Sequence, residues 1–452
     1  MSKTYRPWNP DQSWLLPPSP RDWLPENDLV FFVLDAVADL DLSAITKKYE
    51  QGDGRGYSPY HPRMMATLLL YSYTQGVFSS RRIMKRCERD AAWRVIVQDD
   101  VPNFRTISDF RKLHLKELEG LFVQVLRLCQ EAGLVKLGHV ALDGTKIKAN
   151  ASRHKAMSYG RMKEEEKRLR KEIRELLSQA ESTDAAEDKE YGNSQRGDEL
   201  PEELGRRESR LKKIREARKA LEAQAKAAAQ EERDRQDAAE QKRGGQPESD
   251  SKVDPEQAVP HDKAQYNFTD PTTKIMKASN KGFDQCGNAQ AAVDRENQII
   301  LAADVTNEPN DKKQFQPMAK QAKQNVGRGQ RIDKMSSDNG YFSEDNVKWA
   351  DRHKLDVYIA TGRIKHNEQV PEFPRGRPPQ GLTAKERMAR KLRTRKGRKI
   401  YAQRKWIVEP VFGFIKRGLG FTQFLLNGID KMRGEWRLVC MACNLRKLWA
   451  AA

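Results

Sequence analysis

The sequence predicts an α/β protein with a mixed sheet, an all-α region before the sheet and a helical hairpin inserted into it. Between about residues 55 and 135, apolar side chains recur every three or four positions, which is typical of amphipathic helices. From about residue 286 onward, short apolar runs alternate with helical patterns, as in a sheet covered by helices. The polar stretch between these parts keeps apolar seams at heptad-like spacing, which predicts paired long helices.

Residues 1–135 are predicted to form a helical domain. Its segment RTISDFRKLH can begin a helix at Thr106 or Ser108, because both residue types cap helix N-termini. Arg111 and Lys112 lie in the same segment and are candidates for DNA contacts. The pattern fits a small DNA-binding unit, and a helical module that only packs against the rest of the protein would show the same pattern.

Residues 155–261 are predicted to form an inserted helical hairpin. Its two apolar seams consist of Met162, Leu169, Ile173 and Leu176, and of Leu204, Leu211, Ile214 and Leu221. Pro201 and the stretch GNSQRGD separate the two helices. After about Ala228 the sequence is highly charged, and we expect it to be partly disordered. The insertion serves either as a solvated spacer or as a dimerisation element.

Residues 136–154 and 262–452 are predicted to form the sheet domain. Its first strand ends at Asp143, with Gly144 in the turn, and the insertion follows. Two adjacent strands, NAQAAVD and NQIILAADVT, are joined by Arg295 and Glu296. Next come a helix (DKKQFQPMAKQAKQNV), a strand (KMSSD), a helix (SEDNVKWADRHK) and a strand (DVYIATG). This order of elements is that of a ribonuclease-H-like mixed sheet.

The charge of the chain favours a polyanionic partner. The formal net charge is +19 and the isoelectric point is near 9.6, and each cation that neutralises a phosphate releases a counterion. The segment 375–405 is rich in Lys and Arg with a single acid, Glu386, and we expect it to form a loop that follows a DNA backbone. No apolar run reaches the roughly 20 residues that span a bilayer, and no signal peptide is visible, so we expect a cytoplasmic protein. The CxxC of Cys440 and Cys443 is interpreted as part of a buried helix.

Three carboxylates are the candidates for chemistry. Asp143 and Asp338 each end an apolar strand-like run, and Glu409 lies at the start of an amphipathic pattern. Carboxylates are the ligands that Mg²⁺ and Mn²⁺ prefer, and two such ions about 3.5–4 Å apart activate the attacking oxygen and stabilise the leaving oxygen of a phosphodiester. Asp304 also ends a strand and competes with Asp338, and Asp284, Asp294 and Glu435 are further competing acids.

The residues around Glu409 allow two helix arrangements. If one helix runs through Pro410, then Tyr401, Lys405, Glu409 and Lys416 share a face at 100° per residue, together with Phe412. If the helix instead begins at Pro410, the alignment of Tyr401 and Lys405 with Glu409 is accidental. In the first arrangement the cations would contact phosphates while Glu409 binds metal.

With these residues in view, the chain resembles the DDE transposases of bacterial insertion sequences, in the branch with a helical N-terminal domain and a long insertion. The resemblance rests on LDGTKIKANAS, SDNGYFS and VEPVFGFIKRGLGF, and on the N-terminal YSPYHPRMMATLLLYSYTQGVFSSRRIMKRCERDAAWR. The family's catalytic acids fall on Asp143, Asp338 and Glu409, and its lysine falls on Lys416. Tyr401 and Arg404 keep the family's mutual spacing, but Arg404 is displaced by one position and Lys405 occupies the expected place of the arginine.

This resemblance implies a metal-dependent DNA transposase. Such a protein binds double-stranded DNA at terminal inverted repeats, cleaves strands to expose 3′ hydroxyls and joins them to target DNA with two Mg²⁺ or Mn²⁺ ions. A homodimer on DNA is implied, because two ends are handled together, as is a location at the bacterial nucleoid. Two alternative hypotheses remain. The protein could be a ribonuclease-H-like nuclease that cuts without joining, or a catalytically inactive DNA-binding or regulatory protein derived from a transposase.

Overall fold

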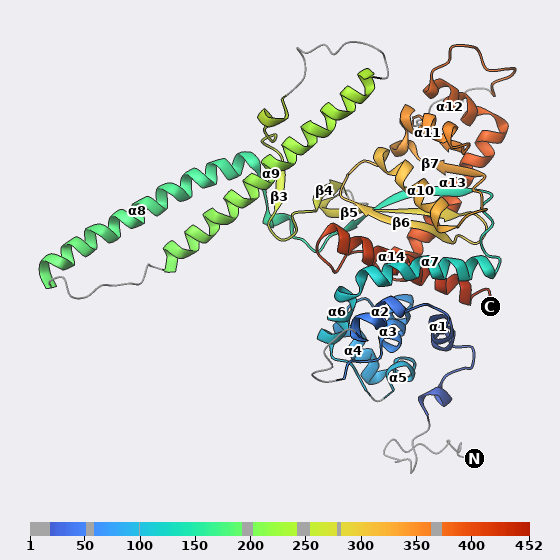
Figure 1. Ribbon diagram of the computed structural model, residues 1–452, viewed down its shortest axis with the longest axis horizontal. Coiled ribbons are helices and arrows are strands. Elements are labelled where there is room, and N and C mark those ends of the chain that lie inside the picture. Colours follow the sequence, from blue (N-terminus) through green and yellow to red (C-terminus); the bar gives the residue numbers. More distant parts are fainter. Residues whose placement is uncertain are drawn as a thin grey trace, which may run out of the picture. The chain divides into compact units, whose positions relative to one another are not determined.

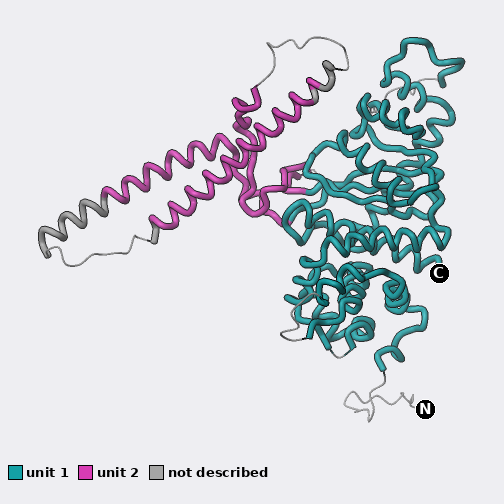
Figure 2. Tube along the Cα trace, in the orientation of Figure 1, with its two compact units in different colours: residues 1–149, 287–452 teal, residues 150–286 magenta. Residues whose placement is uncertain are grey.

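The computed structural model describes residues 19–50, 58–98, 100–191, 202–241, 254–277, 282–362 and 373–452. The chain divides into two compact units (Figure 2). Unit 1 comprises Met1–Ala149 and Gly287–Ala452, and unit 2 comprises Asn150–Cys286. The chain therefore leaves unit 1 after one strand and returns to it within another.

The N-terminal part of unit 1 is helical, as the sequence predicts. After the 3-10 turn η1 (Pro20–Trp23) its helices are α1 (Leu29–Ala38), α2 (Ser43–Glu50), α3 (Pro62–Thr74), α4 (Ser80–Arg89), α5 (Ala91–Val97), α6 (Phe104–Leu113) and α7 (Leu115–Glu131). Helix α3 is the centre of this part, because every residue from Met65 to Thr74 is buried. The predicted cap of α6 was wrong: Asn103, directly before the first helical residue, accepts the amide of Arg105, and Thr106 lies inside the helix.

A mixed sheet forms the other part of unit 1. Strands β1 (Val140–Lys148), β7 (Lys334–Ser337) and β8 (Asp356–Ile359) are parallel neighbours. Strand β5 (Phe283–Asp294) lies on the other side of β1 and pairs with β6 (Ile300–Thr306) in an antiparallel hairpin. The predicted hairpin around Arg295 and Glu296 is thus confirmed, as are the two later strands.

Strand β1 is longer than predicted. It does not end at Asp143 but continues to Lys148, whose backbone bonds to Thr422 and Phe424. Gly144 is therefore not a turn residue. Its lack of a side chain is needed for packing, since a Cβ there would lie 2.3 Å from Nε2 of Gln290 on the neighbouring strand.

Five helices of unit 1 lie between or after the later strands in the sequence (Figure 1). They are α10 (Phe315–Asn325), α11 (Glu344–Arg352), α12 (Ala384–Arg393), α13 (Arg395–Gly413) and α14 (Ile429–Trp449). Helix α14 contacts β6, α7 and α3, so it joins the sheet to the N-terminal helices. Its Cys440 and Cys443 are buried, as are the other three cysteines, Cys87, Cys129 and Cys286. None of the described helices combines the length and the hydropathy that crossing a bilayer requires.

The basic segment before Glu409 is largely helical rather than an extended loop. Helix α12 begins at a capping box formed by Thr383 and Glu386, and α13 begins at Arg395 with Thr394 as its cap. Helix α13 runs through Pro410 and passes into a π-helical turn, Phe414–Gly418, labelled η7. The arrangement with one helix through Pro410 is therefore the observed one.

Unit 2 contains the predicted helical hairpin. Helices α8 (Tyr159–Tyr191) and α9 (Glu202–Gln241) pack through the predicted seams, with Met162, Leu169, Leu211, Ile214 and Leu221 buried. Helix α9 does not fade after Ala228, because the Ala-rich sequence there has high helix propensity. Pro201 and GNSQRGD lie outside the described residues. The unit also holds β2 (Ala156–Ser158), β3 (Gln265–Asn267), β4 (Lys274–Lys277) and the 3-10 turn η4 (Pro255–Gln257).

Candidate active site

The structure brings two of the predicted carboxylates to neighbouring strand positions. Leu142 of β1 is paired with Ser337 of β7, and Asp143 and Asp338 directly follow these two residues. Because the two strands are parallel, the aspartates lie side by side on the sheet. The Asp338 carboxylate makes Asp143 harder to ionise, as expected when a second acid lies nearby.

Asp143 is largely buried and is held by an arginine. Its Oδ2 accepts a hydrogen bond of 2.8 Å from Nη1 of Arg404, and its Oδ1 accepts the amide of Gly144 at 2.9 Å. Burial raises the pKa of Asp143 to about 6, the Arg404 cation opposes this rise, and the Asp338 carboxylate adds to it. The site therefore favours a cation beside Asp143, and Arg404 supplies one.

A third aspartate, Asp311, lies beside the other two and was missed by the sequence analysis. A Cβ at Gly340 would lie 3.0 Å from Oδ1 of Asp338 and 3.1 Å from Oδ2 of Asp311. A Cβ at Gly144 would lie 3.1 Å from Oδ1 of Asp311. Asp311 thus lies beside Gly144, the residue after Asp143, and beside Gly340, two residues after Asp338. It also forms an ion pair with Nζ of Lys146, at 3.8 Å.

Polar side chains from β5 hold Asp311 in place. Its Oδ1 accepts hydrogen bonds from Asn288 at 2.6 Å and from Gln290 at 2.8 Å. Gln290 in turn accepts a hydrogen bond from the hydroxyl of the fully buried Tyr341. Burial, with Asp311, Asp143 and Asp338 nearby, raises the pKa of Tyr341 far above its ordinary value, so the phenol stays protonated and donates. Asn288 and Gln290, which alternate with Gly287, Ala289 and Ala291 in β5, were the sequence signal for this network.

Helix α13 crosses the parallel strands and presents different residues inward and outward. Arg404 is 8% exposed and faces Asp143, and the Tyr401 ring lies 5.8 Å from its guanidinium carbon. Lys405 and Glu409 are exposed. Lys416, beyond the π-helical turn, donates to the hydroxyl of Thr145 on β1. Arg404 and Lys416 therefore contact β1 and Tyr401 lies beside Arg404, whereas Lys405 and Glu409 follow Tyr401 by one and two helical turns on the exposed side of α13.

The acids suit a hard divalent cation in part. Carboxylate oxygens at adjacent strand positions match the ligand preference of Mg²⁺ and Mn²⁺, and a cation would relieve the burial and the repulsion of Asp143. Within the described part of the chain, however, no three acidic, histidine or cysteine side chains are placed to hold one ion together. Asp143 and Asp338 are therefore two adjacent candidate ligands, and Glu409 lies on the exposed side of α13.

The competing acids have other partners. Asp304 lies on β6, and its carboxylate accepts a hydrogen bond from Arg433 of α14. The Asp294 carboxylate accepts the amide of Leu137 at 2.9 Å, and Glu435 is fully buried among the helices. Asp284 belongs to unit 2. None of these acids is part of the cluster around Asp143.

The two N-terminal candidates for DNA contacts differ in exposure. Arg111 is 4% exposed and donates to the carbonyl of Phe78 at 2.9 Å and to the hydroxyl of Tyr73 at 3.1 Å. This corrects the expectation of a surface contact, because its guanidinium is directed into the helical core. Lys112 is on the surface, with Asp109 3.5 Å away.

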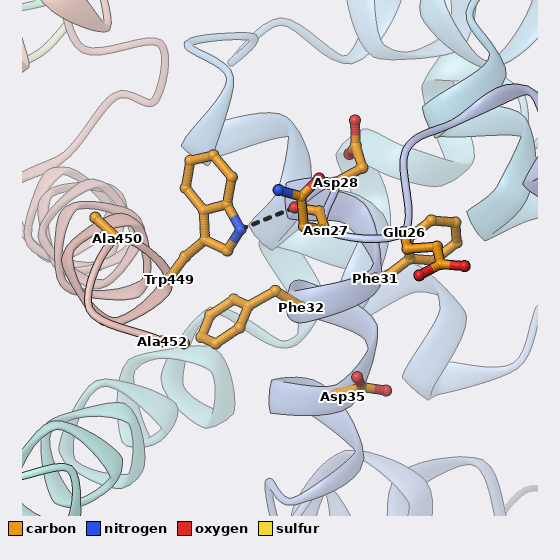
Figure 3. A pocket seen from close by; sticks show the side chains of 9 residues that line it. All are labelled: Glu26, Asn27, Asp28, Phe31, Phe32, Asp35, Trp449, Ala450 and Ala452. Atoms are coloured by element: carbon orange, nitrogen blue, oxygen red, sulfur yellow. Dashed lines mark hydrogen bonds between the residues drawn. The ribbon is translucent and has the colours of Figure 1, made fainter.

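A separate pocket between the start of α1 and the end of α14 is acidic. Figure 3 shows Glu26, Asp28 and Asp35 around it, with the indole of Trp449 bonded to the carbonyl of Asn27. Its three carboxylates repel phosphate, so we do not consider it a nucleic-acid site.

Comparisons with known families agree with this geometry. Residues 250–445 match the family described as "Transposase DDE domain", and residues 18–113 match "Transposase domain (DUF772)". Neither curated proteins nor solved structures gave a match. The first match includes Asp338 and Glu409, and the sheet places Asp143 next to Asp338. With these two domains, the chain belongs to the DDE transposases of the insertion-sequence type.

Proposed function

We propose that this transposase binds the terminal inverted repeats of an insertion sequence, cleaves strands to expose 3′ hydroxyls and joins them to target DNA. The observation that supports this most directly is the pair Asp143 and Asp338 on neighbouring parallel strands, within and beside the matched DDE domain. The sheet order of unit 1 is consistent with a ribonuclease-H-like domain. We assign residues 136–154 and 262–452 to that catalytic domain, 1–135 to DNA binding and 155–261 to the insertion.

Asp143, Asp338 and Glu409 are proposed to hold the divalent ions, Mg²⁺ or Mn²⁺. Two such ions, when bound, activate the attacking oxygen and stabilise the leaving 3′ oxygen. Asp143 and Asp338 are suited to this role because they are adjacent. Burial raises the pKa of the Asp143 carboxyl, and a bound cation would offset this by stabilising the ionised form. Glu409, on the exposed side of α13, would complete the set by approaching them on the DNA-bound protein.

The basic residues of α13 are proposed to have separate roles. Arg404 is buried against Asp143, so its proposed role is to neutralise and orient that carboxylate. Lys405 is exposed and is the better candidate of the two for a DNA phosphate. Tyr401, beside Arg404, and Lys416, bound to Thr145, line the approach to β1 and are proposed to contact DNA near the site.

The partners follow from this chemistry. Double-stranded DNA, as transposon ends and as target, is the substrate, and handling two ends together favours a homodimer on DNA. The working location would be the bacterial cytoplasm, at the nucleoid.

Substitution of the acids tests the proposal. Asp143→Asn, Asp338→Asn and Glu409→Gln should each reduce Mg²⁺- or Mn²⁺-dependent strand cleavage by about a thousandfold or more, with DNA affinity within about twofold of wild type, because each removes a metal ligand but no DNA contact. The readout is the yield of 3′-hydroxyl ends and joined products on DNA that flanks the gene. Asp351→Asn, on the exposed face of α11, makes the same chemical change away from the site and should have no effect.

Full activity of any of the three variants would remove that residue from the site. Cleavage by the wild-type protein without any joined product would favour the ribonuclease-H-like nuclease. Specific binding without cleavage under all metal conditions would favour a regulatory protein derived from a transposase.

A further inference from the structure

Helix α4 carries the densest exposed positive charge in the described N-terminal part. Its ten residues, SRRIMKRCER, include five cations and one acid, Glu88. Ser80, Ile83 and Cys87 are buried and hold the helix against its neighbours, α5 and α6 (Figure 1). All five cations are exposed: Arg81, Arg82, Lys85, Arg86 and Arg89.

Three of these cations form a straight stripe on the side opposite the buried face. Arg82, Lys85 and Arg89 are related by i, i+3 and i+7, which places them within about 60° around the helix axis and about 10 Å along it. By the same geometry, Ile83 points about 130° and Cys87 about 170° away from the centre of this stripe. The stripe therefore faces solvent when α4 is packed.

The other two cations of α4 are used within the fold. The guanidinium of Arg81 lies 4.8 Å from the centre of the Phe104 ring of α6. Arg86 pairs with Asp90 at 3.1 Å and lies over Trp93. In the described part of the chain, no ion pair or ring contact is seen for Arg82, Lys85 or Arg89. Three like charges at this spacing repel one another and favour an anionic partner.

We propose that Arg82, Lys85 and Arg89 of α4 form the surface that docks the backbone of duplex DNA. This rests on the proposed function, since it names where the DNA ends are held. A single helix fits the major groove, which is about 12 Å wide, and a stripe of this length reaches successive phosphates beside it. Helix α6, the helix first expected to contact DNA, is less suited, because Arg111 is buried and Lys112 has Asp109 nearby.

The buried Arg111 holds the start of α4 in place. It donates to the carbonyl of Phe78, and Ser79, the next residue, is the N-cap position of α4. Arg111 thereby fixes the chain where α4 begins. The phosphate-contacting stripe and the arginine that anchors it thus lie on different helices.

The test compares two triple variants of the full-length protein on short duplexes tiled across the DNA that flanks the gene. Arg82→Ala, Lys85→Ala and Arg89→Ala together should weaken binding at least about tenfold at low salt and reduce the salt dependence of log K by about 2 to 3, because each lost phosphate contact removes about 0.9. The control combines Lys47→Ala, Lys116→Ala and Arg127→Ala, exposed cations of α2 and α7 that give the same charge change. It should alter affinity less than about threefold.

A further variant distinguishes docking from misfolding. Arg82→Lys with Arg89→Lys keeps the charges and should retain most of the affinity, because a phosphate accepts either cation. Equal losses in both alanine variants, or a loss in the lysine variant as large as in the alanine variant, would overturn the proposal. If the wild-type protein binds none of the duplexes, the proposed function itself fails. If it binds and the α4 alanine variant binds equally well, only the assignment to α4 fails.

Discussion

Helices α4 and α13 are both rich in Arg and Lys, but their cations differ in burial and in partners. In α13, Arg404 points inward and donates to the carboxylate of Asp143. In α4, Arg82, Lys85 and Arg89 point away from the buried face. The comparison teaches that a count of basic residues does not locate a DNA surface. Burial and pairing decide which cations are available to phosphate.

The largest effect that sharpens this contrast is expected within α13 itself. Arg404→Met leaves Asp143 largely buried without its cation and should slow strand cleavage about a hundredfold, or about 2.7 kcal/mol in activation free energy, with little change in DNA affinity. Lys405→Met, one residue away on the exposed side, should leave cleavage at saturating DNA unchanged and reduce the salt dependence of log K by about one. Single-turnover cleavage and binding titrations at several salt concentrations measure both. If Arg404→Met lowered only the affinity, Arg404 would be a DNA contact, and the proposed difference between α13 and α4 would be wrong.

A second, smaller effect compares Arg111 with Lys112. Arg111→Met leaves the Phe78 carbonyl and the Tyr73 hydroxyl without their buried donor and should lower the free energy of unfolding by about 2 to 4 kcal/mol. Lys112→Ala, on the surface, should change it by less than about 0.5 kcal/mol. Urea unfolding of both variants provides the measurement. Similar stabilities would mean that Arg111 does not anchor the start of α4.

The smallest effect concerns the pH dependence of the same helical core. Glu435 of α14 is fully buried and accepts the amides of Leu425 and Leu426. Burial raises its pKa from the ordinary 4.5 to about 7, and Arg111 and the two amides oppose this rise. The folded protein therefore binds more protons than the unfolded chain between these values, so stability should fall as pH rises from about 4.5 to 7.

Thermal unfolding across this range tests the direction. The fall should be on the order of 1 to 3 kcal/mol in the wild type and should be largely absent in Glu435→Gln, which does not titrate. A wild-type stability that rises with pH over the same interval, with the variant unchanged, would show that Glu435 is ionised in the folded state.

Much of the fold could be predicted because its signals are local. The antiparallel pairing of β5 and β6 followed from two apolar runs joined by Arg295 and Glu296, and the seam of the α8–α9 hairpin followed from the spacing of its leucines. The mixed sheet after an all-α region followed from the change in periodicity. These patterns identify the buried face of each helix or strand, and the spacing of apolar residues in the sequence is enough to recognise them.

The features that were missed depend on contacts between distant residues. Gly144 suggested a turn, but it lies within β1 because Gln290 and Asp311 occupy the space of its side chain. The sequence left open whether α13 runs through Pro410, because the outcome depends on packing against β1 and β7, which outweighs the lost hydrogen bond. Arg111 looked like a surface cation because nothing near it in the sequence showed that Tyr73 and Phe78 would enclose it.

The burial of all five cysteines has a practical consequence for studying this protein on DNA. Burial raises the pKa of Cys87, Cys129 and Cys443 to about 12, so these thiols are enclosed and protonated at neutral pH. A cysteine introduced at an exposed position, such as Glu88 beside the α4 stripe, would react with maleimide reagents far faster than any native thiol. Fluorophores attached there would report the distance between two protein copies as transposon ends are brought together, without first removing any native cysteine.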